Sequence, residues 1–139
     1  MVSKTNTRRD VFRGVYTVLN ASKPSGWYVR SVFPNVDTEF PLIFLHPVDK
    51  NSDFWSNDGT NSSDDILIQI EVMVHIDSAP EVLDTGRDYV TDEIQDNVST
   101  FYSSYNIDLL GIDDGGTNMQ EYNNETYLTG TFTVRFRRL

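Results

Sequence analysis

Hydrophobic and polar residues alternate most regularly over residues 66–76. Six isoleucine and valine residues occupy the even-numbered positions, and the odd-numbered positions include Gln69, Glu71 and His75. Successive side chains of a β-strand point to opposite faces, so this period of two predicts a strand with one buried face. A strand of about eleven residues at roughly 3.3 Å each reaches about 36 Å, which is long for a small domain and requires a cover on its apolar face.

A second alternating segment covers residues 127–138. Three shorter segments predict three further strands. They are residues 27–33, which are aromatic and β-branched, residues 40–45, which are bounded by Pro41 and Pro47, and residues 107–112. In the segment 127–138 one face carries threonines and arginines, and the face that we expect to be buried consists of Leu128, Gly130, Phe132, Val134 and Phe136.

Two segments have the period of an amphipathic helix. The first covers residues 8–21, where Thr7 and Asp10 form a variant of the capping box. The second begins at the S-x-x-E capping box Ser78–Glu81 and is predicted to continue as one helix to about Tyr105. Its apolar stripe consists of Leu83, Val90, Ile94, Val98, Phe101 and Tyr105.

The order helix, three strands, helix, two strands predicts a single α+β domain over residues 1–139. We expect two layers, with an antiparallel sheet of about five strands and two helices packed on one of its faces. Residues 1–6 are predicted to be loose. The other face of the sheet is semi-polar and is expected to be hydrated or to meet another subunit; it carries Gln69, Glu71, Thr129, Thr131 and Arg135.

A long polar loop is predicted over residues 48–65, and it carries the adjacent aromatic residues Phe54 and Trp55. Loops of this length in compact domains are usually functional or disordered. An aromatic pair that does not fold back onto the core is typical of a protein–protein contact. Phe54 and Trp55 are therefore candidates for contact with a partner.

The chain is acidic, with 21 Asp and Glu residues against 11 Lys and Arg residues and a formal net charge of −10. This charge argues against nucleic-acid binding through neutralised phosphates. Aspartate greatly outnumbers glutamate and lysine is rare, as in proteins of salt-loving organisms. An ordinary acidic protein is the alternative, and composition does not separate the two.

Four aspartates follow one another at a spacing of four residues within the second predicted helix. Like charges at this spacing each cost a few tenths of a kcal/mol, so the helix itself does not favour them. Two interpretations stay open: a solvated face, or a surface that repels DNA or meets a basic partner. We call Asp84, Asp88, Asp92 and Asp96 the aspartate ladder. A second acidic pair, Asp113 and Asp114, is predicted to lie in a turn.

Neither a cofactor, a metal ion nor an enzymatic activity is expected. The chain has no cysteine and only two histidines, and it lacks the phosphate-binding, dinucleotide-binding, hydrolase and zinc-protease motifs. An EF-hand is rejected because Phe54 and Leu110 stand where its first aspartate is required. A looser calcium site stays open among Asp53, Asp58, Asp64 and Asp65. We expect no membrane span and no secretory signal.

With these elements in place, the chain resembles the tail terminator (tail-completion) proteins of long-tailed bacteriophages and related archaeal viruses. The resemblance covers Arg8 to Leu139. It rests on the order and length of the elements, on the junction between strand and capped helix at residues 76–81, and on the terminal strand at residues 127–138.

This resemblance implies a hexameric ring of identical copies, stacked on the tail tube protein and docked to the head-side connector. It implies a protein of the virion tail or neck, present in the host cytoplasm during assembly. DNA would pass through the lumen without specific binding, and acidic residues would suit that lumen.

Several residues are candidates for interaction in such a ring. The aspartate ladder or Asp113 and Asp114 would supply lumen charge. Phe54 and Trp55 would reach a neighbouring copy or the tube. Arg135 and Arg137, on the polar side of the last strand, are further candidates.

Three alternatives stay open beside this interpretation. The chain could be another neck or tail-tube component, or a small-ligand-binding α+β domain with an apolar pocket between helices and sheet. An enzyme is the third alternative, and the absence of a recognisable nucleophile–base pair argues against it.

Overall fold

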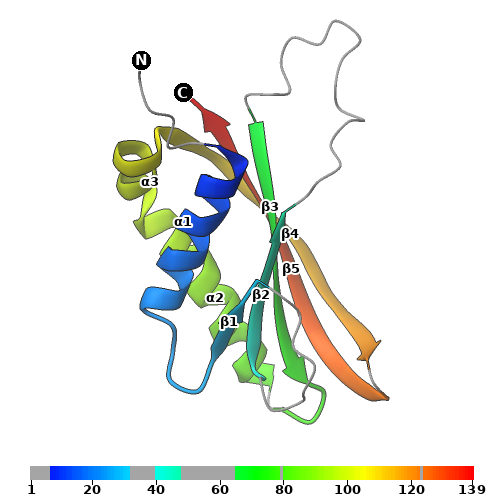
Figure 1. Cartoon of the computed structure of the whole chain (residues 1–139). Helices are drawn as coiled ribbons and strands as arrows, with labels where there is room; N and C mark the ends of the chain where they lie inside the picture. Colours follow the sequence, from blue (N-terminus) through cyan, green and yellow to red (C-terminus); the bar gives the residue numbers. More distant parts are fainter. Residues whose placement is uncertain (1–6, 32–39, 48–64, 79, 123) are drawn as a thin grey trace, which may run out of the picture.

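A computed structural model of the chain confirms the predicted two-layer α+β fold. The structure describes residues 7–31, 40–47, 65–78, 80–122 and 124–139, in which helices cover one face of a five-stranded sheet (Figure 1). The elements are α1 (Arg8–Ala21), β1 (Tyr28–Arg30), β2 (Leu42–Pro47), β3 (Asp65–His75), α2 (Pro80–Asp96), α3 (Val98–Tyr105), β4 (Ile107–Tyr122) and β5 (Glu125–Arg138).

The strands lie in the order β1-β2-β3-β5-β4, so β1 and β4 are the two outer strands. The pairs β2–β3, β3–β5 and β4–β5 are antiparallel, as predicted. The pair β1–β2 is parallel, which corrects the prediction of an antiparallel sheet. Only three residues pair on each strand there, and so short a segment carries no sequence signal for its direction.

The second predicted helix is two helices, α2 and α3, separated at Asn97. Asn97 leaves helical geometry with φ −106° and ψ 18°, and its side-chain amide donates a hydrogen bond to the carbonyl of Glu93. Asparagine side chains compete with the helical backbone in this way. Val98 was predicted to lie in the buried stripe, and the break leaves it 40% exposed instead.

β4 continues to Tyr122, ten residues beyond its predicted end, which corrects the turn predicted at Asp113 and Asp114. Its pairing with β5 shifts register between Leu109 and Gly111 and again between Asp114 and Thr117. Gly116 lies in the second irregularity with φ +83°, a conformation that glycine adopts at little cost. The glycines after Asp114 therefore form a bulge within a strand rather than a reversal of the chain.

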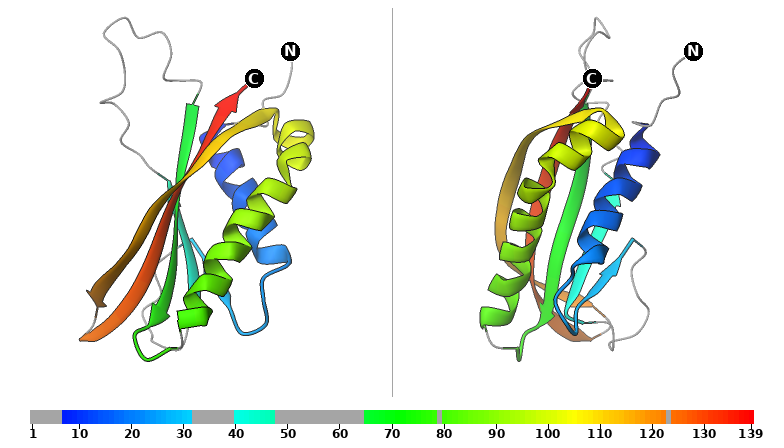
Figure 2. Two further views of the ribbon diagram at one scale, coloured as in Figure 1. Left: turned by 180° about the vertical axis from the view of Figure 1, so that it is seen from behind. Right: turned by 90° about the vertical axis from the view of Figure 1, so that its left-hand side faces the viewer.

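The core lies between the helices and the sheet. Figure 2 shows these two layers from two sides. The predicted apolar faces are confirmed: Ile68 lies opposite Val134 and Ile70 opposite Phe132, and all four side chains are buried. Ile76 is an exception, because β3 ends at His75 and leaves the Ile76 side chain 43% exposed.

The opposite face of the sheet is less polar than predicted. A second cluster of buried residues contains Leu42, Met73 and Tyr127, and Phe40 stacks on Tyr127 with ring centroids 4.5 Å apart. Thr129, expected on a hydrated surface, is fully buried. The chain thus covers part of this face by itself.

α2 approaches the sheet closely at Gly86. A Cβ atom at this position would lie 2.4 Å from the Trp27 ring and 2.6 Å from Cγ1 of Val72. We expect Gly86→Ala to lower the free energy of unfolding by about 1–3 kcal/mol, because overpacking outweighs the better helix propensity of alanine. Urea denaturation measures the loss. In a Trp27→Leu background the same substitution should cost less, and an equal cost in both backgrounds would contradict this explanation.

Candidate functional site

The aspartate ladder lies on the outer face of α2. All four carboxylates are exposed, opposite the buried side chains of Leu83, Val90 and Ile94, as predicted. None of the four forms an ion pair with another residue that the structure describes. The ladder is therefore a surface of uncompensated negative charge, and water solvates it.

The second acidic pair is divided between the two faces of the sheet. Asp113 lies opposite Thr133 of β5, on the face away from the helices, and Asp114 lies opposite Phe132, on the helix side. Both side chains are exposed. The two aspartates therefore do not form a single charged site.

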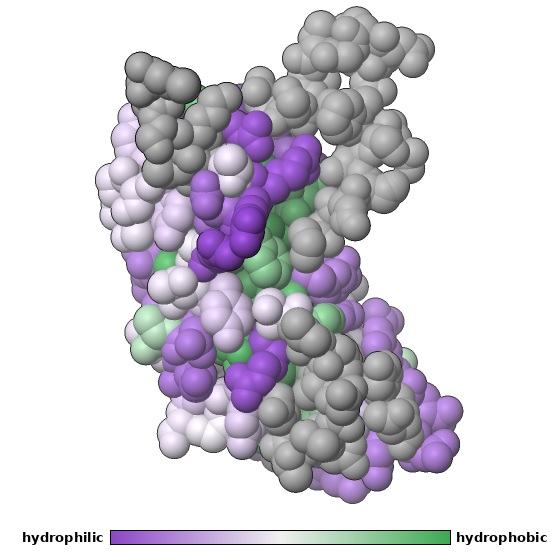
Figure 3. All heavy atoms as spheres, in the orientation of Figure 1, coloured by the Kyte–Doolittle hydropathy of each residue, from purple (hydrophilic) through white to green (hydrophobic). Residues whose placement is uncertain are grey.

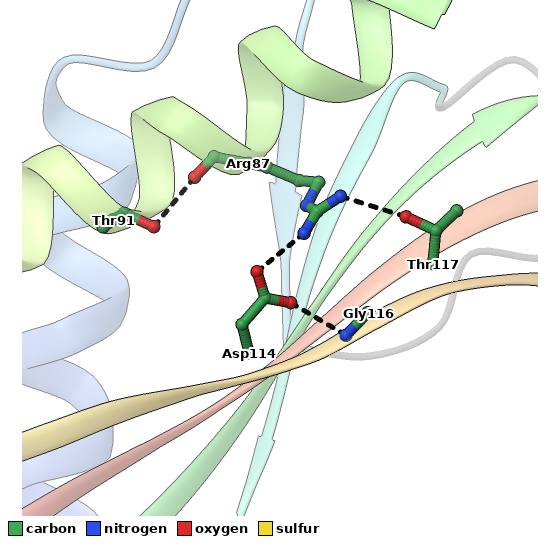
Figure 4. Close-up of polar contacts among 5 residues, drawn as sticks. All are labelled: Arg87, Thr91, Asp114, Gly116 and Thr117. Atoms are coloured by element: carbon green, nitrogen blue, oxygen red, sulfur yellow. Dashed lines mark hydrogen bonds and ion pairs between the residues drawn. The ribbon is translucent and has the colours of Figure 1, made fainter.

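Arg87 of α2 reaches across the sheet to Asp114 (Figure 4). Its Nη2 lies 2.6 Å from Oδ2 of Asp114, and its Nη1 donates a hydrogen bond of 3.0 Å to Oγ1 of Thr117. The stem of Arg87 passes over Gly130, where a Cβ atom would lie only 3.0 Å from Cδ of the arginine. The guanidinium also lies 6.0 Å from the centre of the Phe132 ring. Arg87 thus connects α2 to the outer strand β4 across β5.

Two groups lower the pKa of Asp114. The largest effect comes from the backbone N–H of Gly116, which donates a hydrogen bond of 2.8 Å to Oδ1. Burial acts in the opposite direction, and the hydrogen bond and charge of Arg87 lower the pKa further. A carboxylate with a lowered pKa stabilises the folded state above its unfolded pKa, near 4. That stabilisation is lost as the pH falls through the lowered pKa of the folded state.

Replacing Arg87 by methionine tests this contact, because methionine keeps the apolar stem. We expect Arg87→Met to lower the free energy of unfolding at pH 7 by about 0.5–1 kcal/mol, since the pair is partly exposed to solvent. The difference from wild type should shrink when urea denaturation is repeated at pH 5, 4, 3 and 2. A difference that stays constant down to pH 2 would exclude the ion pair as its cause. Arg135→Met is the matched control.

The two arginines of the last strand lie away from the aspartate ladder, on the sheet face that also carries Asp113. Arg135 and Arg137 are exposed on the sheet face opposite the helices. Nε of Arg137 lies 3.8 Å from Oδ1 of Asp65, and both side chains are largely accessible to water. Phe54 and Trp55 lie outside the described residues. The candidates from the sequence are therefore spread over three surfaces and do not converge on one site.

Sequence analysis missed the contact of Arg87 with Asp114 and Thr117. One signal was available: Arg87 is the single Lys or Arg residue between Lys50 and Arg135, in the middle of the most acidic part of the chain. A lone cation in such a segment is surrounded by possible carboxylate partners. The identity of that partner depends on the register of β4, which the sequence did not reveal.

The described residues contain no group of three or more His, Asp or Glu side chains that could hold a metal ion. Of the loose calcium site, Asp53, Asp58 and Asp64 lie outside these residues, and Asp65 pairs with Arg137.

Among the helices that the structure describes, none has the length and apolar character needed to cross a bilayer. The chain matches no family model and no curated protein.

Proposed function

We propose that the chain is a structural virion protein that caps the tail tube as a ring and joins the tail to the head connector. One observation carries the proposal: the helices occupy a single face of the sheet, and in the described residues the outer sides of β1 and β4 pair with no further strand. An outer strand presents unpaired N–H and C=O groups to a neighbouring chain. Copies of such a domain can join side by side around a closed ring.

The charge of the protein supports passage of DNA through the ring. The net charge is −10, and the aspartate ladder and Asp113 are exposed without a cation partner among the described residues. A lumen lined by carboxylates repels phosphates, so that the duplex moves through without binding. We assign Asp84, Asp88 and Asp92 of the aspartate ladder to this lumen in the proposal.

A ligand-binding domain is supported less well. It requires an apolar pocket between the helices and the sheet, and that layer holds closely packed side chains, among them Val15, Val72, Val90 and Ile94, each with no exposed surface. Another neck or tail-tube component would share the features of the proposal. The position of the bound protein, at the tube end or along the tube, distinguishes a terminator from such a component.

The test mixes the purified chain with tail tubes assembled from the tube protein of the same virus. Gold-labelled protein should bind at one end of each tube, and native mass spectrometry of the released material should show a ring of identical copies. Label along the whole length of the tubes would indicate a tube component instead. A protein that stays monomeric and unbound in the presence of tubes would contradict the proposal.

A further inference from the structure

A basic hollow lies on the outer side of α1. It has a volume of about 490 Å³, and its lining includes Arg9, Phe12, Arg13 and Tyr16 of α1 together with Ser31, which follows β1. Both arginines are exposed and neither forms an ion pair with a described residue, while the two aromatic side chains are half-buried. In Figure 3 hydrophilic residues gather over the upper part of α1. We call this surface the basic flank.

An acidic hollow lies where α2, α3 and β4 meet. Its volume is about 690 Å³, and its lining includes Asp96 of α2, Val98 and Tyr102 of α3, and Asp108 of β4. Val98 is 40% exposed and Tyr102 is 57% exposed, so two large side chains with apolar surface line the same hollow as Asp96 and Asp108. We call this surface the acidic flank.

The two flanks border opposite edges of the sheet. α1 packs against β1, and α3 packs against β4, which are the two outer strands. Figure 2 shows α1 with β1 on one side of the molecule, and α2 leading into α3 with β4 on the other. One copy therefore presents positive charge with aromatic groups on one side, and negative charge with Val98 and Tyr102 on the opposite side.

We propose that the basic flank of one copy binds the acidic flank of the next copy. Arg9 and Arg13 pair with Asp96 and Asp108, since hydrogen bonds between arginine and carboxylate are charge-assisted and stronger than those between neutral groups. Phe12 and Tyr16 pack against Val98 and Tyr102. Every copy has a net charge of −10, so the basic flank is the surface that overcomes the general repulsion between copies.

This contact joins two different surfaces, so it leaves one free flank at each end of a growing chain of copies. Such head-to-tail contacts close into a ring when the rotation between neighbours permits it. Only the closure of these contacts into a ring rests on the proposed function. It adds which sides of the domain meet and which residues select the partner.

Charge reversal on each flank provides the test. One variant carries Arg9→Glu and Arg13→Glu, and the other carries Asp96→Arg and Asp108→Asn. Asparagine is used at position 108 because Asp108 lies opposite Arg137 in the β4–β5 ladder, where a second arginine would face a like charge. Glutamate near the start of α1 and arginine at the end of α2 both suit the helix dipole, so both variants should fold.

Sedimentation and native mass spectrometry, alone and on tail tubes, give the readout. Each variant alone should weaken self-association at least tenfold, because its two flanks then carry charge of the same sign. An equimolar mixture should recover association, with the two variants alternating. Asp77→Arg with Glu125→Gln changes the net charge as the second variant does, away from both flanks, and should associate like wild type.

Two results would overturn the inference. If wild type forms rings that neither variant weakens, or if the mixture fails to recover them, the flanks are not the interface and the proposed function survives. If wild type forms no assembly even on tail tubes, the inference and the proposed function both fail.

Discussion

A chain that ends before Phe132 does not fold, in our expectation. β5 pairs with β3 on one side and β4 on the other, so its loss divides the sheet. Phe132, Val134 and Phe136 are buried in the core. Burial of three such side chains contributes roughly 5–9 kcal/mol, which is comparable to the whole stability of a typical domain, about 5–15 kcal/mol.

Circular dichroism and thermal denaturation measure this effect. The truncated chain should lack a cooperative transition, while a control that lacks only Leu139, a half-exposed residue, should retain one. A truncated chain that melts cooperatively would show that the sheet does not depend on β5.

Replacement of Phe101 by alanine should lower the free energy of unfolding by about 3–5 kcal/mol, the range for a buried phenylalanine. Phe101 is 1% exposed and is the one side chain of α3 in the core cluster of buried residues. The rings of Phe101 and Phe136 pack edge to face, with their centroids 5.1 Å apart. The substitution removes both the burial and this aromatic contact, so α3 should detach from the sheet.

Urea denaturation at low protein concentration gives the magnitude. The neighbouring Tyr102, 57% exposed, provides the control, because Tyr102→Ala should cost less than about 0.5 kcal/mol. Similar losses for the two variants would mean that α3 does not anchor to the core through Phe101.

The sequence predicted those elements whose periodicity reflects burial on one face. Alternation over residues 66–76 and 127–138 located β3 and β5, and apolar stripes located α1 and α2. The break at Asn97 was missed because one asparagine changes helix propensity little, and the hydrogen bond of its side chain to the carbonyl of Glu93 leaves no periodic signal in the sequence. Tyr105 also packs within 3 Å of the Cβ position of Gly14, which no local pattern reveals.

The extent of β4 was missed for a related reason. Residues 113–116 read Asp-Asp-Gly-Gly, which locally favours a turn. In the structure β5 supplies a partner along the whole segment, and the register shifts absorb the glycines. Pairing with a long neighbouring strand therefore overrides the local preference, and only the three-dimensional structure shows it.

Prediction of the candidate surfaces succeeded in part. Exposure of the aspartate ladder follows from helical spacing, and the structure confirms it. The contact between Arg87 and Asp114, and the separation of Asp113 from Asp114, depend on register, which spacing does not determine. The two flanks join residues far apart in the sequence, such as Arg13 with Ser31 and Tyr102 with Asp108, so they required the fold.

The proposed function makes cryo-electron microscopy of purified virus particles that contain the chain the most direct measurement. Our account predicts one ring of identical α+β domains between tail tube and head, with Asp84, Asp88 and Asp92 toward the lumen. Density for the chain elsewhere in the particle, or a monomer at the neck, would contradict it.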